Sequence, residues 1–273
     1  MQRAVREGGL PFDVSDVPAD ELAAVLEQHA ASGVRRVAIA GGDGTIALAA
    51  GIAARLSLEL AIIPAGTLNH LATDLRIPSD LDEALRIATS GRTRSIDAAS
   101  VNGHFFLNTS SVGTYVTFVR LRERLERYLG YHLASFVAAF RLWIRPRVFT
   151  VEVEIGGTPR AEMTPLIFAG VGERELKLPT LGGRARDGKR GLHLMIVRGR
   201  TPARIAALAF AAAARGTRSA ARGPALDAFL VDRFTIRLPR PRGRVATDGE
   251  LHTMTAPLEY VWIADAVRVV TPR

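Results

Sequence analysis

The sequence predicts two domains: an N-terminal doubly wound parallel α/β domain, followed by a mostly antiparallel β-sandwich-like domain. Two observations carry this prediction. Up to residue 94, apolar strand-like runs alternate with helical patterns, which is typical of a parallel sheet covered by helices. Beyond that point, short alternating runs are separated by turn dipeptides such as Asn102-Gly103, which is typical of antiparallel hairpins. We therefore expect domains at 1–94 and 95–273, with the final residues packing back on the first domain.

In the first domain, apolar residues at helical spacing predict a helix over 18–32 that ends at Gly33. Two apolar runs rich in Ile, Leu, Val and Ala then predict strands, and a helical pattern follows each of them. This β-α-β-α order implies a parallel sheet. The expected elements after the first helix are strand 35–40, helix 45–56, strand 60–63, a short helix at 68–75 and a helix at 80–90.

In the second domain, Asn102-Gly103 joins two strand-like segments, 95–101 and 104–109, and Gly156-Gly157 follows another alternating run. Arginine-rich helical patterns interrupt the strands. Short strands of this kind predict a β-rich domain. The expected helices are one or two within 116–145 and one at 202–215, and the further strands are 148–155, 164–171, 192–198, 229–238, 243–247 and 258–263.

The composition limits the classes of protein to consider. The 273 residues include no cysteine, which excludes disulfides and thiolate metal sites. The formal net charge of +9 favours anionic partners, such as phosphates or acidic lipid surfaces, although an arginine- and alanine-rich genome would produce the same excess. No basic stripe interleaved with aromatic residues is present, so we expect no nucleic-acid partner. No apolar run is long enough to span a bilayer, and the N-terminus MQRAVREGG lacks the apolar core of a signal peptide, so we expect an intracellular protein.

Two glycine-containing loops each follow an expected strand: GGDGT at 41–45 and PAGTLN at 64–69. Glycine has no Cβ and lets a backbone turn sharply or approach a ligand closely. Thr45 and Thr67 place a hydroxyl where a helix should begin, and a helix N-terminus offers N–H groups and a favourable dipole to a phosphate. One such loop is weak support for a site, but two at the same end of a parallel sheet predict a nucleotide site.

Polar residues in these loops have structural as well as functional interpretations. Asp43 could hold Mg²⁺ between its carboxylate and a phosphate, or it could hydrogen-bond its own turn. The matching second loop favours the first role. Asn69 could bind a ribose or a phosphate, or it could hold the loop. We interpret His70 as structural, because no metal-ligand partner lies near it in the sequence.

Late in the chain, Thr247-Asp248-Gly249-Glu250 lies between two strand-like runs. Asp-Gly is by default a hairpin turn, and spacing alone favours that interpretation. Two acids around one glycine are also suited to general-base catalysis, in which one carboxylate takes a proton from a hydroxyl. The arginine-rich loop around Asp187-Gly188 is by default a solvated loop, and its alternative role is to meet an anionic head group.

With these motifs in view, the chain resembles the bacterial diacylglycerol kinase-like family of lipid kinases, which includes the sphingosine and ceramide kinases and whose superfamily extends to the NAD kinases. GGDGT, a following P-x-G-T-x-N motif and a late DGE form a specific signature. The segments that carry the resemblance occur in the family's order: GGDGTI at 41–46, PAGTLNHLATDLRIP at 64–78, SIDAASVNGHFFLNTSSVG at 95–113, TPLIFAGVGERELKLPTLGGR at 164–184 and TDGE at 247–250.

The resemblance implies a fold of the NAD kinase/diacylglycerol kinase type and ATP-dependent transfer of the γ-phosphate, with Mg²⁺, to a hydroxyl of diacylglycerol or a related lipid. Carried over residue by residue, Glu250 would accept the proton, with Asp248 and Asp43 as further catalytic residues. The resemblance also implies a bacterial enzyme of phospholipid biosynthesis in the cytoplasm, peripherally associated with the anionic inner face of the membrane; a homodimer is left open. The nucleotide site would be formed by Gly41, Gly42, Asp43, Gly44, Thr45, Gly66, Thr67 and Asn69.

Three departures from the family pattern qualify this expectation. The family normally opens with a strand and an NPxSG-like phosphate loop that this sequence does not show, and Ala47 replaces a frequent asparagine. Of the acidic segment that holds a structural metal in some members, only Asp187 remains as a candidate ligand. The alternative to a lipid kinase is a catalytically weak or inactive nucleotide- or lipid-binding homologue, and we expect the chain as given to be a weak or inactive catalyst. The sequence identifies neither the acceptor lipid nor the nucleoside triphosphate.

Overall fold

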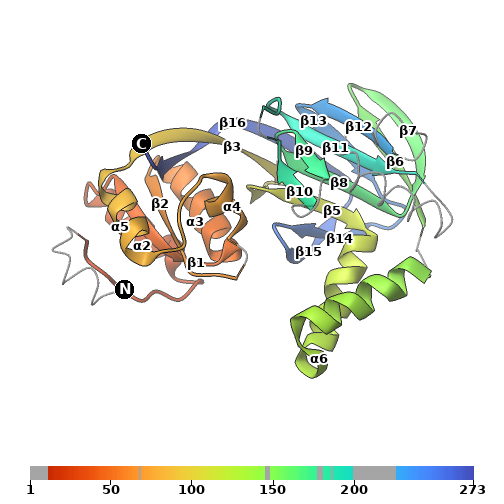
Figure 1. Ribbon diagram of the computed structural model, residues 1–273. Coiled ribbons are helices and arrows are strands. Elements are labelled where there is room, and N and C mark those ends of the chain that lie inside the picture. The colour runs from red at the N-terminus through yellow and green to blue at the C-terminus, as the bar shows by residue number, and fades with distance from the viewer. Residues whose placement is uncertain (1–11, 68, 145–147, 177–180, 186, 199–225) are drawn as a thin grey trace. The chain divides into compact units, whose positions relative to one another are not determined.

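The computed structural model describes residues 12–67, 69–144, 148–176, 181–185, 187–198 and 226–273. The chain divides into two compact units. Unit 1 comprises Met1–Ala98 and Ile263–Arg273, and unit 2 comprises Ala99–Trp262. Two long strands, β3 (Arg92–Val101) and β16 (Leu258–Thr271), contribute residues to both units (Figure 1).

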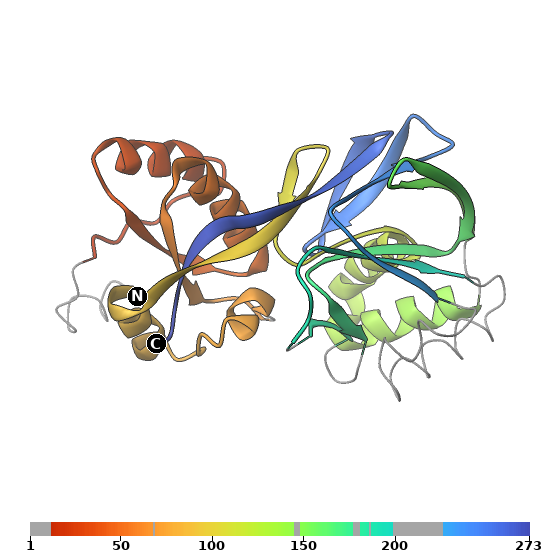
Figure 2. The same ribbon diagram turned by 90° about the horizontal axis from the view of Figure 1, so that it is seen from above.

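Unit 1 is built on a parallel pair of strands, β1 (Arg36–Gly41) and β2 (Glu59–Pro64). Their register runs without a shift from one end to the other. The C-terminal part of β16 pairs in parallel with β2 on its other side, and β3 pairs with β16, as Figure 2 shows. The C-terminal part of β16 therefore adds a strand to the sheet of unit 1.

Helices that connect these strands cover the sheet with small and branched apolar residues. The helix α3 packs on both β1 and β2, and its buried residues include Ile46, Ala49 and Ala53. The side chain of Asp80 caps the N-terminus of α5 by accepting a hydrogen bond from the backbone N–H of Glu83 at 2.9 Å. The helices of unit 1 are α2 (Leu22–Ala31), α3 (Asp43–Leu56), α4 (His70–Asp74) and α5 (Leu81–Ser90).

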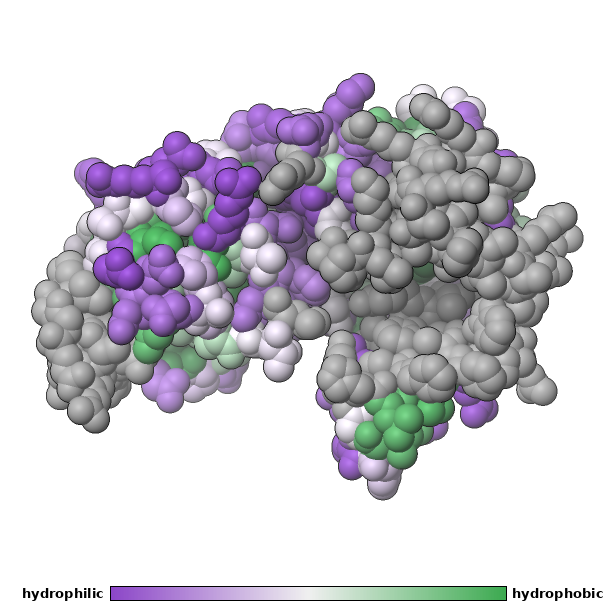
Figure 3. All heavy atoms as spheres, in the orientation of Figure 1, coloured by the Kyte–Doolittle hydropathy of each residue, from purple (hydrophilic) through white to green (hydrophobic). Residues whose placement is uncertain are grey.

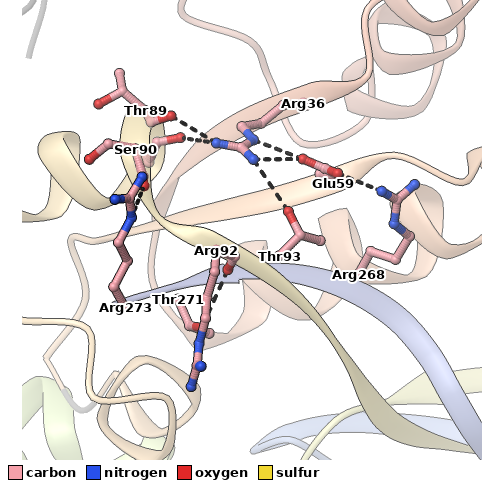
Figure 4. Close-up of polar contacts among 10 residues, drawn as sticks. Arg36, Glu59, Thr89, Ser90, Arg92, Thr93, Arg268, Thr271 and Arg273 are labelled. Carbon is pink, nitrogen blue, oxygen red and sulfur yellow. Dashed lines mark hydrogen bonds and ion pairs between the residues drawn. The ribbon is translucent and has the colours of Figure 1, made fainter.

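An ion-pair network joins the strands of unit 1 at the end where β1 and β2 begin. Arg36 lies opposite Glu59 in register, and the two side chains approach to 2.8 Å. Arg36 also donates to the carbonyl oxygens of Ala88 and Thr89 at the end of α5, and Arg268 of β16 pairs with the second oxygen of Glu59 (Figure 4). Burial alone would raise the pKa of Glu59, but the hydrogen bonds and the two cations outweigh it and hold that pKa below its ordinary value.

Unit 2 contains two antiparallel sheets that enclose one hydrophobic core. One sheet has the strand order β12-β11-β8-β5-β14-β15. In the other sheet, the first residues of β16 pair with β13, and the order continues through β6 to β7. The rings of Phe234 and Tyr260 stack at a centroid distance of 4.5 Å, and the Tyr260 hydroxyl hydrogen-bonds to Ser110 of the facing sheet at 3.0 Å. The strands confined to this unit are β4 (His104–Phe106), β5 (Thr109–Gly113), β6 (Phe149–Ile155), β7 (Thr158–Thr164), β8 (Leu166–Val171), β9 (Arg174–Leu176), β10 (Leu181–Arg184), β11 (Leu192–Val197), β12 (Leu226–Val231), β13 (Arg233–Arg237), β14 (Arg242–Thr247) and β15 (Glu250–Thr255).

The helix α6 (Thr114–Ile144) bends at Gly130, whose φ of 70° and ψ of 165° are outside the helical region. Large apolar side chains on either side of the bend are exposed: Tyr128 by 78%, Leu129 by 39% and Leu133 by 51%. Figure 3 shows the resulting apolar surface on α6. We call these three residues the α6 apex. No described helix is both long and apolar enough to cross a bilayer.

The expected order of a parallel α/β part and an antiparallel β part is confirmed. Some element boundaries were wrong. The segment expected as one strand over 229–238 is two strands, because the chain passes at Asp232 from the sheet of β12 to the sheet of β13. β15 was not expected as a separate strand, and β16 extends well beyond 258–263. The helix expected at 202–215 lies outside the described residues.

Candidate functional site

The two glycine loops of unit 1 lie at the same edge of the sheet, because the strands before them are parallel and in register. Gly41 and Pro64 are paired at the ends of β1 and β2. The backbone N–H of Ala65 donates to the carbonyl oxygen of Gly41 at 3.0 Å, so hydrogen bonding between the two segments continues into the loops. The carboxyl edge of a parallel sheet is the common position of nucleotide sites.

The two loops touch each other through their backbones. A Cβ on Gly66 would lie 2.6 Å from the Cα of Gly42, which is closer than real Cβ contacts. A Cβ on Gly41 would likewise lie 2.7 Å from the Cβ of Thr45. Glycine at 66 is therefore required for the two loops to meet, whereas glycine at 41 leaves room for the Thr45 side chain within the first loop.

The helix α3 begins directly in the first loop. Gly42 is its N-cap residue, no side chain caps it, and the carboxylate-bearing Asp43 is the first helical residue. The expectation of a helix from residue 45 was therefore two residues late, and Gly44 and Thr45 lie within the first turn. Asp43 is half-buried and, among the described residues, forms no hydrogen bond or ion pair. A carboxylate at this place complements the positive end of the helix dipole.

Asn69 fixes the shape of the second loop. Its side-chain Oδ1 accepts a hydrogen bond from the N–H of Gly66 at 2.9 Å, and its Nδ2 donates to the carbonyl oxygen of the same residue at 2.8 Å. Both ends of the amide are thus used within the loop, and the Asn69 backbone adopts the left-handed conformation with a φ of 48°. Thr67 is exposed beside it, and His70 is the exposed first residue of α4.

In unit 2, the carboxylate of Asp248 accepts hydrogen bonds from three consecutive backbone N–H groups. Oδ2 accepts from Leu107 at 2.7 Å, and Oδ1 accepts from Asn108 and Thr109 at 2.8 and 2.9 Å. Burial raises the pKa of Asp248, whereas the three N–H donors and the Arg174 guanidinium oppose that rise. Both oxygens of the Asp248 side chain thus act as hydrogen-bond acceptors. We call this arrangement the Asp248 latch; it ties the β14–β15 turn to the loop before β5.

Sequence reasoning missed the buried cation that supports this latch. Arg174 is only 3% exposed. Its side chain donates to the carbonyl oxygens of Asn108 at 2.8 Å and Val171 at 3.1 Å, and its backbone N–H donates to Nδ1 of His193 at 2.9 Å. The segment that carries the family resemblance at 164–184 includes Arg174, but nothing in the spacing indicated that its guanidinium is buried beside the 107–109 loop.

Glu250 follows the turn as the exposed first residue of β15 and pairs in register with Thr247. Next to it, the rings of His104 and His252 lie with centroids 4.0 Å apart, which the sequence did not indicate. Burial and the neighbouring His252 lower the pKa of His104, and the charge of Glu250 works in the opposite direction. The turn thus holds one carboxylate by hydrogen bonds and presents the other, Glu250, to solvent beside a histidine pair.

Asp187, the candidate metal ligand from the sequence, is an exposed residue in a turn. Within the part of the chain that the structure describes, no three His, Asp or Glu side chains gather closely enough to hold a metal ion. Asp43 and Glu250, by contrast, lie on the two segments that carry the most specific motifs, one in each unit.

Comparisons with known proteins agree with these motifs. Residues 1–101 match the family model of the diacylglycerol kinase catalytic domain. A Cronobacter sakazakii (strain ATCC BAA-894) protein called probable lipid kinase YegS-like is 35% identical over 136 residues, which cover 47% of this chain and 45% of that protein. A protein of the same name from Yersinia pestis (strain Pestoides F) is 38% identical over 112 residues, or 38% of each chain. The match thus spans less than half the length of these curated relatives.

A solved diacylglycerol kinase from Bacillus anthracis str. Sterne has the same fold, with a TM-score of 0.72 over 99% of this chain and 91% of that one at 20% identity. This comparison covers both units, whereas the family model covers 1–101. Residues 1–101 are therefore similar to the diacylglycerol kinase catalytic domain and to lipid kinase-like relatives, and both units share the fold of the solved protein.

Proposed function

We propose that this protein is an ATP-dependent lipid kinase that transfers the γ-phosphate to a hydroxyl of diacylglycerol or a related lipid in bacterial phospholipid biosynthesis. The observation that carries the proposal is the backbone contact between Gly42 and Gly66 at the carboxyl edge of a parallel sheet. The family match and the names of the relatives support a kinase-type enzyme.

The residues of unit 1 fit a nucleotide phosphate and Mg²⁺. The N-terminus of α3 carries no side-chain cap, so its first N–H groups can face an anion. Glycine at 66 lets the two loops approach each other where a Cβ would collide with the backbone of Gly42. Asp43 would hold Mg²⁺ through a carboxylate oxygen, because a carboxylate beside phosphates needs a cation between them. When bound, Mg²⁺ and ATP supply the transferable phosphate and neutralise its developing charge.

In unit 2, two carboxylates have different roles in the reaction of the lipid acceptor. Glu250 accepts the proton of the lipid hydroxyl as that oxygen forms its bond to phosphorus. Asp248 holds the turn through its three N–H donors, so it positions Glu250. Thr45 and Thr67 are exposed in the unit 1 loops and can donate hydroxyl hydrogen bonds to phosphate oxygens.

A lipid acceptor requires access to a membrane, and α6 supplies a surface for it. The α6 apex exposes Tyr128, Leu129 and Leu133, and exposed arginines such as Arg124 and Arg127 lie on the same helix. Apolar residues beside cations are typical of helices that bind at an anionic membrane surface. We include peripheral attachment to the cytoplasmic face of the membrane in the proposed function.

The test is phosphate transfer from radiolabelled ATP to a panel of lipid alcohols that includes diacylglycerol. Glu250→Gln should abolish turnover and leave ATP affinity nearly unchanged, whereas Asp43→Asn should weaken ATP and Mg²⁺ binding. Glu259→Gln, at an exposed residue of β16, is the matched control and should change neither. ATP and lipid binding without transfer to any acceptor would favour the alternative, an inactive binding homologue.

A further inference from the structure

A cavity lies within unit 2, between the first turns of α6, the end of β5 and the bend that joins β13 to β14. The cavity has a volume of about 720 Å³. Its apolar part includes Phe149 and Leu238, which lie against two glycines of the flanking strands. A Cβ on Gly113 would collide with the Phe149 ring, and a Cβ on Gly243 would collide with the Leu238 side chain. The glycines therefore allow both apolar side chains to lie flat along the wall.

Four arginines line the same cavity: Arg120 from α6, Arg240 from the bend, and Arg242 and Arg244 from β14. Arg242 and Arg244 are two residues apart on a strand, so they point to the same face of it. All four are exposed, and the described lining contains no acidic side chain. None of the four forms an ion pair or a hydrogen bond with another described residue.

Two other arginines of unit 2, by contrast, form ion pairs with acidic side chains. Arg237, three residues before Arg240, contacts Glu152 at 3.1 Å and Glu154 at 2.8 Å. Arg198 contacts Asp227 at 2.6 Å. The arginines of the cavity repel one another and gain no neutralising charge from their surroundings. An anionic ligand would remove that repulsion, and guanidinium groups are well suited to phosphate oxygens.

The cavity is separate from the Asp248 latch. Arg244, the lining arginine of β14 nearest to the latch, precedes Thr247 by three residues, and three residues of strand span roughly 10 Å. A phosphate bound by these arginines is therefore not the phosphate that would be transferred near Glu250. The α6 apex lies on the same helix as one of the cavity arginines. Leu129 follows Arg120 by nine helical residues, which is roughly 14 Å along the helix axis.

We propose that this cavity binds the phosphate and glycerol region of an anionic phospholipid that is not the acceptor of the reaction. Four unpaired arginines match the phosphodiester, and the wall formed by Phe149 and Leu238 matches the first carbons of the acyl chains. Free phosphate shares the anionic chemistry but not the apolar wall. The proposal rests on the membrane attachment in the proposed function and is independent of the kinase reaction.

The experiment is calorimetric titration of the full chain with monomeric dihexanoyl phosphatidylglycerol, with inorganic phosphate and dihexanoyl phosphatidylcholine in separate arms. The test variant is Arg240→Gln/Arg242→Gln/Arg244→Gln. The matched control is Arg35→Gln/Arg92→Gln/Arg233→Gln, which makes the same change in net charge at exposed arginines outside the cavity. Thermal unfolding checks that both variants are folded. Arg240→Gln alone changes no strand residue and serves if the triple variant does not fold.

We expect phosphatidylglycerol to bind at least about tenfold more tightly than either phosphate or phosphatidylcholine, because only it combines net charge with an apolar part. The cavity variant should lose about tenfold or more of that affinity, and the control should retain it. An equal loss in both triple variants would show non-specific charge attraction, and equal binding of inorganic phosphate would show a phosphate site; either result overturns the proposal. Phosphate transfer to a soluble short-chain diacylglycerol should persist in the cavity variant, so a failed cavity is distinguishable from a failed kinase.

Discussion

Asp248 shows how one side chain can join segments that are remote in the sequence. Its two oxygens accept from the N–H groups of Leu107, Asn108 and Thr109, which lie about 140 residues earlier in the chain. The TDGE motif predicts a hairpin turn because Asp-Gly is a dipeptide that such turns prefer. The hydrogen bonds that give Asp248 its role come from elsewhere, so local spacing could not reveal them.

We predict that Asp248→Asn destabilises unit 2 and loosens the 107–109 loop. An amide has one acceptor oxygen, and its NH₂ group would face the N–H of Leu107 at the Oδ2 position. Leaving that donor unsatisfied should lower the free energy of unfolding by about 1–3 kcal/mol. Chemical denaturation and hydrogen exchange of residues 107–109 measure this. Glu250→Gln is the control, because Glu250 is exposed; an equal loss of exchange protection in both variants would contradict the latch.

Glu59 provides a pH-dependent contribution to the stability of unit 1. Its pKa in the folded protein lies below the ordinary value of 4.5, despite the opposing effect of burial, because of Arg36 and Arg268. A lowered pKa means that the folded state holds fewer protons than the unfolded state, so the stabilisation is full above about pH 4.5 and is lost as the pH falls through the folded pKa.

We predict that Glu59→Gln removes this part of the acid sensitivity. At pH 7 the variant should be less stable by about 1–3 kcal/mol, because Arg36 and Arg268 lose a charged acceptor. Below pH 4 the difference from the natural protein should shrink toward zero. Denaturation curves between pH 3 and 7 give the two profiles. Glu21→Gln, at an exposed residue, is the control; a difference that stays constant with pH would disprove the assignment to Glu59.

At the scale of elements, the unit 1 site was the part most accessible from the sequence. Glycine at 66 has a local physical cause, the lack of space for a Cβ, and two parallel strands must place their following loops at one edge. The sequence left two roles open for Asn69, binding a ligand or holding the loop. The structure shows that its amide forms hydrogen bonds within the loop. Whether it also contacts a nucleotide stays a prediction, as do the roles of Asp43 and Glu250.

Element boundaries failed where strands change sheet or where the partner is distant. Residues 226–237 are uniformly strand-like, so no local signal marked the passage between sheets at Asp232. β16 continues through Val267 and Val269 because β2 and β3 of unit 1 pair with it, which local composition does not encode. The arginine-lined cavity was missed for the same reason: its residues Arg120 of α6 and Arg242 of β14 are 122 residues apart in the sequence.

The α6 apex is the element for which a membrane role makes a sharp prediction. Leu129→Ser/Leu133→Ser removes two exposed leucines and should leave thermal stability unchanged, because neither is buried. Binding to vesicles rich in phosphatidylglycerol should fall by about tenfold or more, since each buried leucine contributes about 1.5–3 kcal/mol to insertion. Vesicle co-sedimentation measures the loss. Leu48→Ser, at an exposed leucine of α3, is the control; unchanged binding of the apex variant would argue against this surface.

At the scale of the whole molecule, the chain leaves unit 1 after Ala98 and re-enters it at Ile263. The returning segment pairs with β2 and β3 and buries Val267, Val269 and Val270 completely. Three valines removed from water are worth on the order of 5–9 kcal/mol, which is comparable to the total stability of a small domain. Unit 1 thus depends on residues 263–273, which are remote in the sequence from residues 1–98.

We predict that residues 1–98 alone do not fold cooperatively, and that the same residues joined to 263–273 by a short Gly-Ser linker do. A short linker is enough because residues 98 and 263, the ends to be joined, lie on the neighbouring strands β3 and β16, which are about 5 Å apart. The backbone N–H of Asp265 donates to Oδ1 of Asp97 at 3.0 Å, which supports this placement. A second contact, from Arg273 to the carbonyl oxygen of Ser90, supports the far end of the segment.

Thermal unfolding by circular dichroism distinguishes the two fragments, and a linked fragment carrying Val267→Asp/Val269→Asp is the control that should not fold. If the linked fragment also binds an ATP analogue, the glycine loops need no residue of unit 2 to take their shape. Cooperative unfolding of 1–98 at the same temperature would show instead that the returning strand is dispensable.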